Sequence, residues 1–314
     1  MVLKYEDRYV WDHWIYREGE NFHMFYLQAK RETKNASERH EKASIGHAIS
    51  QDLINWSEVG TAITKSLPGS WDDLATWTGS IIQSKETKEY FLFYTGVHRN
   101  EKGLIQSIGL AISSDLNNWK KYGNTPVAKA DSRFYATQEN GSVNTDFRDP
   151  WVFFDELNQK WHMLITANSS ENKDPKKSGV VGHAISENLV DWQVLPPIAT
   201  ETGFGQIEVF QVVQIRDKYV GIFCCGKDYI EGKSDEFTTG TYSVPMHSPI
   251  GPIDFNKAEI FHAKNIYAGR IIQNQSGQHN LIGFVTADLD SNAPCEISNP
   301  IRVTINRNGN LQVI

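Results

Sequence analysis

Three acidic residues stand near the starts of strand-like segments that are far apart in this sequence. Asp12 lies in VWDHW, Asp149 in FRDPWVF and Glu208 in IEVFQVV. Cleavage of a glycosidic bond needs one carboxylate as nucleophile or base and one carboxylic acid that protonates the leaving oxygen. A third carboxylate can hold sugar hydroxyls through bonds that tighten in the transition state. The three residues are therefore a candidate site for glycoside cleavage.

Polar neighbours of these acids suit the same chemistry. Arg148 precedes Asp149 and offers a planar fork to sugar hydroxyls, and its charge favours the ionised form of Asp149. Partial burial and a second carboxylate nearby would raise the pKa of the residue that acts as acid. Gln206, two residues before Glu208, either binds sugar and tunes the acid or faces solvent at a strand edge.

A repeat shows which elements must position these side chains. The strings IGHAIS (45–50), IGLAIS (108–113) and VGHAIS (181–186) are each preceded by an aromatic strand and followed by a turn and a tryptophan. These tryptophans, which we expect to close the core of each repeat, are Trp56, Trp119 and Trp192. Two looser units begin at Glu208 and near Tyr267. Strand-only units that recur along a chain predict a propeller, so we expect an all-β, five-bladed β-propeller.

The length of the repeat distinguishes this propeller from a common alternative. Interaction propellers of the WD type have repeats of about 40–45 residues, and the repeat here is longer, with long charged loops. We expect one domain over residues 1–314, without a C-terminal β-sandwich.

In a propeller, the innermost strands of the blades line a central channel, and the residues that begin these strands converge. Each predicted opening strand carries polar residues near its start: Asp12, Thr78 and Ser80, Arg148 and Asp149, Glu208, and Arg270. A single carboxylate at such a place is ordinarily a turn or edge residue, but three in register with the repeat favour a shared site. Tyr267 and Arg270 either line the channel or, in the case of the arginine, pair with a neighbouring blade. His13 would alternate to the opposite face of a regular strand, away from the site.

Charge and composition limit the partners. The 31 Lys and Arg residues against 38 Asp and Glu residues give a net charge of −7, without a basic stripe, which disfavours nucleic acid. No stretch resembles a signal peptide or reaches about 18 apolar residues, so we expect a cytoplasmic protein without a membrane partner.

Cofactor and metal motifs are also missing from the sequence. Cys224, Cys225 and Cys295 form neither a disulfide framework nor a zinc motif and are interpreted as buried thiols. The sequence has no glycine-rich phosphate loop and its histidines are scattered, so we expect no cofactor and no metal. The charged stretch 227–237 is expected to form a solvated loop near the channel mouth.

These motifs resemble a known group of enzymes. VWDHW looks like the nucleophile segment of levansucrase-type enzymes of glycoside hydrolase family 68, and the RDP string at 148–150 is the middle motif that this family shares with the invertase-like family 32. FHMFY (22–26) and WTGS (77–80) also resemble invertase-like strings, so the likeness runs in order from residue 8 to about 215.

The resemblance implies roles for individual residues. Asp12 would be the nucleophile, Asp149 the transition-state stabiliser and Glu208 the general acid/base. The residues that the resemblance implies for binding of the fructosyl ring are Trp11, Trp77, Ser80 and Arg148. Gln206 and Tyr267 are further candidates by their own positions, two residues before Glu208 and at the start of the fifth unit. The sequence departs from the pattern in two places: the asparagine-aspartate-proline-asparagine string is absent at Asp12, and Val209 follows Glu208 where cysteine or arginine is usual.

Three functions remain open at this point. The first is a retaining β-fructofuranosidase that cleaves sucrose or short fructo-oligosaccharides through a fructosyl-Asp12 intermediate, which water or a second sugar resolves. The second is an inverting arabinan- or xylan-type enzyme of the related family 43, against which Arg148 argues. The third is a propeller that only binds sugar or protein, against which the presence of all three carboxylates argues. In each enzyme the partner is a small oligosaccharide, and the sequence does not indicate the oligomeric state.

Overall fold

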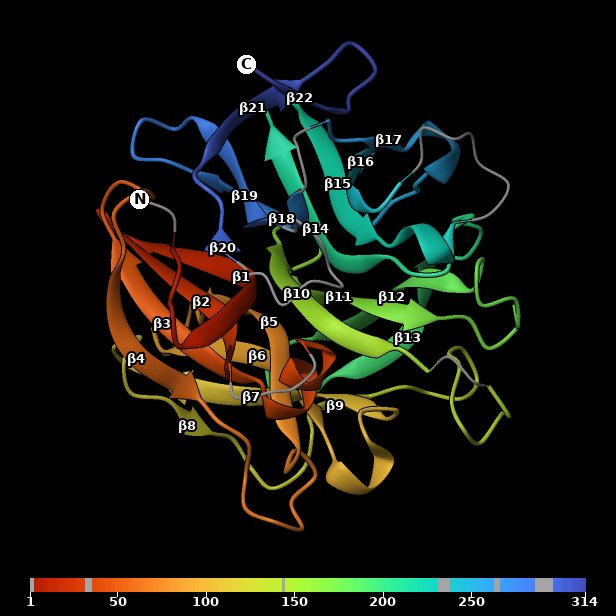
Figure 1. The fold of residues 1–314 in the computed structure, drawn as a ribbon. Helices are drawn as coiled ribbons and strands as arrows, with labels where there is room; N and C mark the ends of the chain where they lie inside the picture. Colours follow the sequence, from red (N-terminus) through yellow and green to blue (C-terminus); the bar gives the residue numbers. More distant parts are fainter. Residues whose placement is uncertain (1–2, 32–35, 143–144, 231–237, 263–265, 286–295) are drawn as a thin grey trace.

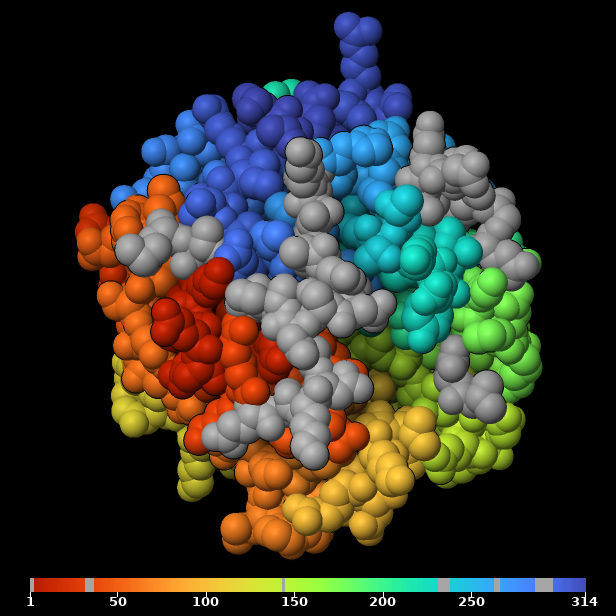
Figure 2. Space-filling model, in the orientation of Figure 1, coloured from red at the N-terminus to blue at the C-terminus, as the bar shows by residue number. Residues whose placement is uncertain are grey.

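Five antiparallel sheets follow one another around a central axis in chain order (Figure 1). The computed structural model describes residues 3–31, 36–142, 145–230, 238–262, 266–285 and 296–314. Every strand in these ranges belongs to one of the five sheets. The predicted all-β, five-bladed propeller is confirmed, and Figure 2 shows the blades succeeding one another from red to blue around one face.

The bounds of the elements follow blade by blade. Blade 1 contains β1 (Arg8–Glu18), β2 (Asn21–Lys30), β3 (Ser44–Ser50) and β4 (Ser57–Ile63). Blade 2 contains β5 (Ala75–Gln83), β6 (Tyr90–Val97), β7 (Gln106–Ser113), β8 (Lys120–Lys121) and β9 (Ala128–Lys129). Blade 3 contains β10 (Phe147–Asp155), β11 (Lys160–Asn168), β12 (Gly179–Ser186) and β13 (Gln193–Ala199). Blade 4 contains β14 (Glu208–Ile215), β15 (Lys218–Cys225), β16 (Gly240–Met246) and β17 (Glu259–Ile260). Blade 5 contains β18 (Ile266–Gln273), β19 (His279–Val285), β20 (Glu296–Ile297), β21 (Ile301–Ile305) and β22 (Leu311–Val313). Short 3₁₀ helices lie in the loops: η1 (Ala36–Lys42), η2 (Arg99–Glu101), η3 (Lys227–Tyr229) and η4 (Phe255–Lys257).

The middle strands of the blades are buried on both faces because each blade packs between two others. All eight positions of β6 are buried, and β2 is buried at eight consecutive positions. A continuous apolar run bounded by turns is typical of such fully buried strands. This explains why the aromatic strings of the repeat do not alternate with polar residues.

The repeat tryptophans follow a shared turn. Leu53 has a left-handed backbone conformation, with φ of 65°, and its carbonyl accepts a hydrogen bond of 3.2 Å from Trp56 Nε1. The same bond recurs from Trp119 to Leu116 at 2.9 Å and from Trp192 to Leu189 at 3.0 Å.

These tryptophans are only half-buried, which differs from the prediction that they close the core of their own blades. Trp119 meets Phe25 of blade 1 edge to face, with 5.6 Å between ring centroids. Trp192 meets Phe93 of blade 2 in the same way at 5.4 Å. Trp119 and Trp192 therefore seal the junction with the preceding blade, because the turn carries them to the blade surface.

The ring of blades is closed between the first and the last. The innermost strands β1, β5, β10, β14 and β18 each contact the next, and β18 contacts β1. Near the N-terminus, Leu3 forms a β-bridge with Ile297 of blade 5, whose N–H donates to the Leu3 carbonyl at 3.0 Å. Blade 5 is thus held by a segment from the other end of the chain.

Two smaller predictions concern thiols and membranes. Cys224 and Cys225 are buried and unbridged in β15, as expected, whereas Cys295 lies outside the described residues. In the described part of the chain, the helices are too short to span a bilayer.

Candidate active site

Each innermost strand carries one β-bulge near its start. The register against the second strand of the blade shifts between Trp11 and His13, Trp77 and Gly79, Arg148 and Trp151, Glu208 and Gln211, and Tyr267 and Arg270. A bulge interrupts the alternation of a strand, so two successive side chains can face the same side. The pairs Trp11–Asp12, Trp77–Thr78, Arg148–Asp149 and Glu208–Val209 accordingly all line one pocket.

Three of the bulges hold non-glycine residues in a left-handed conformation. The φ angles are 55° at Asp149, 55° at Val209 and 49° at Ala268. Such conformations cost of order 1–3 kcal/mol and persist only when the surroundings impose them. Threonines of the preceding blade impose two of them: Thr95 Oγ1 accepts from the N–H of Asp149 at 3.0 Å, and Thr166 Oγ1 from that of Val209 at 3.1 Å.

The pocket lies at the end of the channel where the innermost strands have their bulges. It has a volume of about 860 Å³ and contains all three predicted carboxylates. Asp12 comes from β1, Asp149 from β10 and Glu208 from β14, so three blades contribute one acid each. A pocket of this size is in the range of small-molecule sites.

Among the described residues, Asp12 has one close hydrogen-bond donor. Thr78 Oγ1 donates to Asp12 Oδ2 at 2.5 Å. Desolvation raises the pKa of Asp12 above its usual value, and the charge of Glu208 acts in the same direction. The Thr78 hydrogen bond and the charge of Arg270 oppose this rise.

Asp149 is held more tightly. It is 2% exposed, and its Oδ2 lies 3.0 Å from Thr166 Oγ1, 3.3 Å from the Val209 N–H and 3.4 Å from Arg148 Nε. Burial raises the pKa of Asp149 to about 7, although the charge of Arg148 lowers it. The expected effect of Arg148 is therefore present but smaller than the effect of burial.

Arg148 connects the carboxylates of the pocket wall. Its Nη2 donates to Glu208 Oε1 at 2.7 Å, and its Nη1 forms an ion pair with Asp146. Tyr267 Oη donates to the other oxygen of Glu208. Gln206 Nε2 donates to Asp146 Oδ2 at 3.1 Å, so this glutamine supports the partner of Arg148. Both oxygens of Glu208 are thus oriented by fixed donors.

The structure brings together most of the predicted site residues. Trp11, Trp77, Arg148, Gln206 and Tyr267 all line the pocket with the three acids.

Ser80 is the exception. It is 1% exposed and its Oγ accepts from the Val152 N–H at 3.2 Å, which joins blades 2 and 3. Ser80 comes after the bulge at Trp77–Gly79 and does not line the pocket. Thr78 lies inside the bulge, and its side chain lines the pocket where the motif had suggested the serine. His13 is also outside the pocket lining, but its strand is bulged, so simple alternation is not the reason.

Sequence reasoning missed several residues of the pocket lining. They are Ser37, Arg39 and His40 in η1, Gly226 beside η3, Thr238 and Thr239, and Gln106 at the start of β7. Lys227, Asp228 and Tyr229 of η3 also line the pocket, and they belong to the stretch 227–237 that was predicted as a loop near the channel mouth. Trp77 Nε1 donates to the His40 carbonyl at 2.7 Å, which fixes η1 to the pocket. The predicted solvated loop is found in part, since Lys227 and Asp228 are exposed at the pocket, while 231–237 lie outside the described residues. Apart from Gln106, which precedes IGLAIS, these residues follow no repeat that would reveal them.

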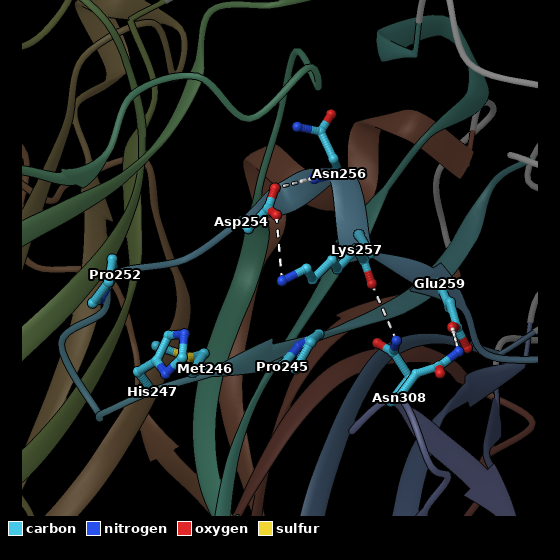
Figure 3. A pocket seen from close by; sticks show the side chains of 11 residues that line it. Pro245, Met246, His247, Pro252, Asp254, Asn256, Lys257, Glu259 and Asn308 are labelled. Carbon is cyan, nitrogen blue, oxygen red and sulfur yellow. Dashed lines mark hydrogen bonds and ion pairs between the residues drawn. The ribbon is translucent and has the colours of Figure 1, made fainter.

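A second hollow, at the outer edges of blades 4 and 5, provides a contrast (Figure 3). Its carboxylates already have partners: Asp254 accepts from the Asn256 N–H at 3.1 Å and pairs with Lys257, and Glu259 accepts from Asn308 Nδ2 at 3.0 Å. These acids are spread around the rim. The channel pocket instead gathers three acids from different blades.

Comparison with known proteins agrees with this geometry. The family model described as the glycosyl hydrolases family 32 N-terminal domain matches residues 12–300. The chain belongs to glycosyl hydrolase family 32. The predicted resemblance to the invertase-like and levansucrase-like group is thereby confirmed.

Curated relatives of this family 32 chain are distant and longer. It is 26% identical to sucrose-6-phosphate hydrolase of Bacillus subtilis over 286 residues, which cover 86% of this chain and 53% of the relative. It is 28% identical to the levanbiose-producing levanase of the same organism, over 73% of this chain and 40% of the relative. The chain therefore spans about half, or less, of the length of these relatives.

Solved structures share the fold. Inulosucrase from Halalkalicoccus jeotgali bound to kestose superposes with a TM-score of 0.77 at 18% identity, covering 98% of this chain and 87% of that one. The Bombyx mori family 32 β-fructofuranosidase BmSUC1 superposes with a TM-score of 0.74 at 18% identity, covering 100% of this chain and 64% of that one. At these identities the likeness establishes a common propeller.

Proposed function

We propose that this family 32 protein is a retaining β-fructofuranosidase that cleaves sucrose or short fructo-oligosaccharides. The observation that carries the proposal is the convergence of Asp12, Asp149 and Glu208 from three bulged strands on one pocket. Membership of family 32 supports the reaction class. It also disfavours the arabinan- and xylan-type alternative of family 43.

The proposed reaction has two steps. Asp12 attacks the anomeric carbon of the fructosyl unit while Glu208 protonates the leaving oxygen, which forms a fructosyl-Asp12 intermediate. Glu208 then removes a proton from water, or from the hydroxyl of a second sugar, and this nucleophile displaces Asp12 with net retention. Asp149 and Arg148 hold the fructosyl hydroxyls, and the bonds that Asp149 accepts from these hydroxyls strengthen as positive charge develops on the ring.

The substrate range follows from the pocket and from the relatives. A volume of about 860 Å³ accommodates a short oligosaccharide, and η1 and η3 supply polar groups to the pocket lining. The activities for which the relatives are named include hydrolysis of sucrose 6-phosphate and of levan. These names support a substrate that contains a fructosyl unit. The polar groups of η1 and η3 would bind the second sugar.

The test is sugar release by the wild type and by Glu208→Gln. The substrates are sucrose, kestose-type oligosaccharides, inulin, arabinan oligosaccharides and aryl furanosides, with the anomer of the product followed by NMR. Glu187→Gln is a matched control, because the Glu187 side chain is 82% exposed on blade 3, outside the pocket. Fructose released with retention by the wild type and the control, and lost in Glu208→Gln, is the expected result. Release of arabinose or xylose with inversion, or of no sugar at all, would contradict the proposal.

A further inference from the structure

Arg270 is a buried cation that the proposed reaction does not yet use. It lies in β18, is 3% exposed and does not line the pocket. Its Nη1 donates to the Phe210 carbonyl at 3.2 Å, but Nε and Nη2 have no hydrogen-bond partner among the described residues. An unpaired buried charge costs several kcal/mol, so its presence needs a compensating interaction.

The guanidinium reaches across the channel beneath the pocket. The Arg270 backbone belongs to blade 5 and its hydrogen-bond partner Phe210 to blade 4, whereas Arg270 Cζ lies 5.1 Å from the ring centroid of Trp151 in blade 3. Trp151 comes two residues after Asp149, directly after the bulge. The cation therefore sits under the ring of bulges that presents the carboxylates.

The charged groups that face Arg270 come from three elements. Asp149 of β10 and, to a smaller extent, Asp12 of β1 stabilise its charge, and the Cys224 thiol of β15 lies nearby. Burial is the larger effect and lowers the pKa of Arg270 to about 10, so it is a cation at neutral pH. His13 of β1 is kept neutral there, because burial and the charge of Arg270 lower its pKa to about 3.

The two arginines of the site have different partners. Arg148 is occupied by Asp146, Glu208 and Asp149 on the wall of the pocket. Arg270 makes no ion pair of this kind with any described residue. Its strand β18 contacts β1, the strand of Asp12, and its charge favours the carboxylate form of Asp12. Asp12 is also influenced by Glu208, which disfavours its ionised form, and by Arg39, which favours it.

We propose that Arg270 is a positioning residue that keeps Asp12 ionised, and hence nucleophilic, from beneath the pocket without touching the substrate. The inference rests on the proposed function, in which Asp12 is the nucleophile. The two arginines then have separate roles, since Arg148 serves the acid and the sugar, and Arg270 serves the nucleophile.

The test is the pH profile of kcat/KM in Arg270→Gln, Arg270→Met and Arg270→Lys on the fructosyl substrate that the wild type cleaves best. Glutamine keeps a donor for the Phe210 carbonyl, methionine keeps apolar volume, and lysine keeps the charge. An opposite charge at short range lowers a carboxyl pKa by about 1–3 units. We therefore expect the acidic limb to move up by about one unit or more in both neutral variants, with kcat falling more than KM rises, and to stay near the wild-type position in the lysine variant.

Gln211→Met is the matched control. Gln211 occupies the corresponding place after the bulge of β14, is 2% exposed, and joins blades 4 and 5 through two bonds with the Ile271 backbone, of 3.0 and 2.7 Å. It carries no charge. Its replacement should lower the melting temperature and leave the acidic limb in place.

A second readout does not depend on turnover. The Asp12 carboxyl is titrated by NMR in aspartate-labelled wild type and in whichever neutral variant retains cooperative thermal unfolding, with Asp12→Asn used for assignment. A higher titration midpoint of Asp12 in the neutral variant than in the wild type supports the inference, whether or not a fructosyl substrate is cleaved. Absence of cleavage would refute only the proposed function. An unchanged midpoint and an unchanged acidic limb, or an equal shift in Gln211→Met, would overturn it.

Discussion

At the scale of single residues, the three carboxylates differ in how the protein holds them. Asp149 is enclosed by a hydroxyl, a backbone N–H and a guanidinium, whereas Asp12 receives one hydroxyl. The Glu208 side chain is 18% exposed, against 3% for Asp149, and is oriented by Arg148 and Tyr267. The more accessible acid is the one proposed to exchange protons with the leaving group and with water.

Asp12→Asn tests the nucleophile directly. Asparagine preserves the size of the side chain and an oxygen that accepts from Thr78, so the fold should remain. Loss of the attacking carboxylate should reduce kcat by on the order of 10³-fold or more, as for other nucleophiles that act as part of a unit. The measurement is steady-state kinetics together with thermal unfolding. A folded variant with wild-type turnover would refute the assignment.

The Asp149→Asn variant tests whether ionisation of the buried Asp149 carboxyl lowers the stability of the folded protein. Burial raises the pKa of Asp149 from 3.8 to about 7, so the folded protein binds this proton more tightly than the unfolded chain does. The stabilising contribution is complete below pH 3.8 and is lost as the pH rises to about 7, because the buried carboxylate must then ionise. The melting temperature of the variant, relative to wild type, should therefore be higher at about pH 8 than at about pH 5.

For this comparison, a change of 1 kcal/mol in the free energy of unfolding shifts the melting temperature by about 2–4 °C in a domain of 150–250 residues. The shift is somewhat smaller in a longer chain. Asp155→Asn is a suitable control, because Asp155 lies in the same strand but has a lowered pKa. A relative melting temperature of Asp149→Asn that stays flat over this pH range would show that the ionised form carries no such cost.

At the scale of elements, the blades carry different side chains at equivalent buried positions of their second and third strands. In blades 1 and 3 a histidine on the second strand bonds to one on the third, His23 to His47 at 3.0 Å and His162 to His183 at 2.8 Å. Blade 2 has Phe91 and Leu110 at the corresponding positions of its strands. The histidine pairs thus occupy places that apolar side chains can fill.

These pairs predict a loss of stability in mild acid. Burial lowers the pKa of His47 to about 3 and of His183 to about 4, below the usual 6.5. Stability from the neutral rings is complete above pH 6.5 and declines as the pH falls toward the folded-state values, because the unfolded chain binds more protons.

The double variant His23→Phe/His47→Leu copies blade 2. It should unfold at a temperature close to wild type at about pH 7.5 and lose less stability between about pH 6.5 and 4.5. The check is a series of melting curves across that range, with His279→Gln, a less buried histidine, as control. Identical pH dependences of the double variant and the wild type would contradict the prediction.

At the scale of the whole molecule, the ring depends on contacts between the two ends of the described chain. Leu3 is 7% exposed, packs in the core of blade 1 and bridges to Ile297 of blade 5. Because β1 also contacts β18, closure of the ring fixes the place of Asp12 relative to Arg270.

Leu3→Ala should weaken this closure. Truncation of a buried leucine costs about 2–5 kcal/mol, and this site, near a terminus, belongs at the lower end. The expected result is a lower melting temperature with an unchanged pH profile of kcat/KM, and Leu67→Ala, at an 80% exposed site, is the control. A melting temperature equal to that of the control would show that the bridge does not contribute to stability.

Several features of the protein could be read directly from the order of its residues. The recurrence of IGHAIS-like strings with their turns and tryptophans predicted the blades, because local patterning and turn chemistry determine strands. The positions of Asp12, Asp149 and Glu208 at the starts of opening strands then predicted a common pocket, because a propeller brings its strand starts together.

Other features depended on tertiary structure. The exchange of Ser80 for Thr78 follows from a bulge, which depends on pairing with a second strand. The pocket residues of η1 and η3 are brought in by loops, and Arg270 crosses from blade 5 to blade 3. The raised pKa of Asp149 results mainly from burial by several blades at once. Local periodicity is a property of a few neighbouring residues, whereas desolvation and charge separation depend on atoms that only the closed ring brings close together.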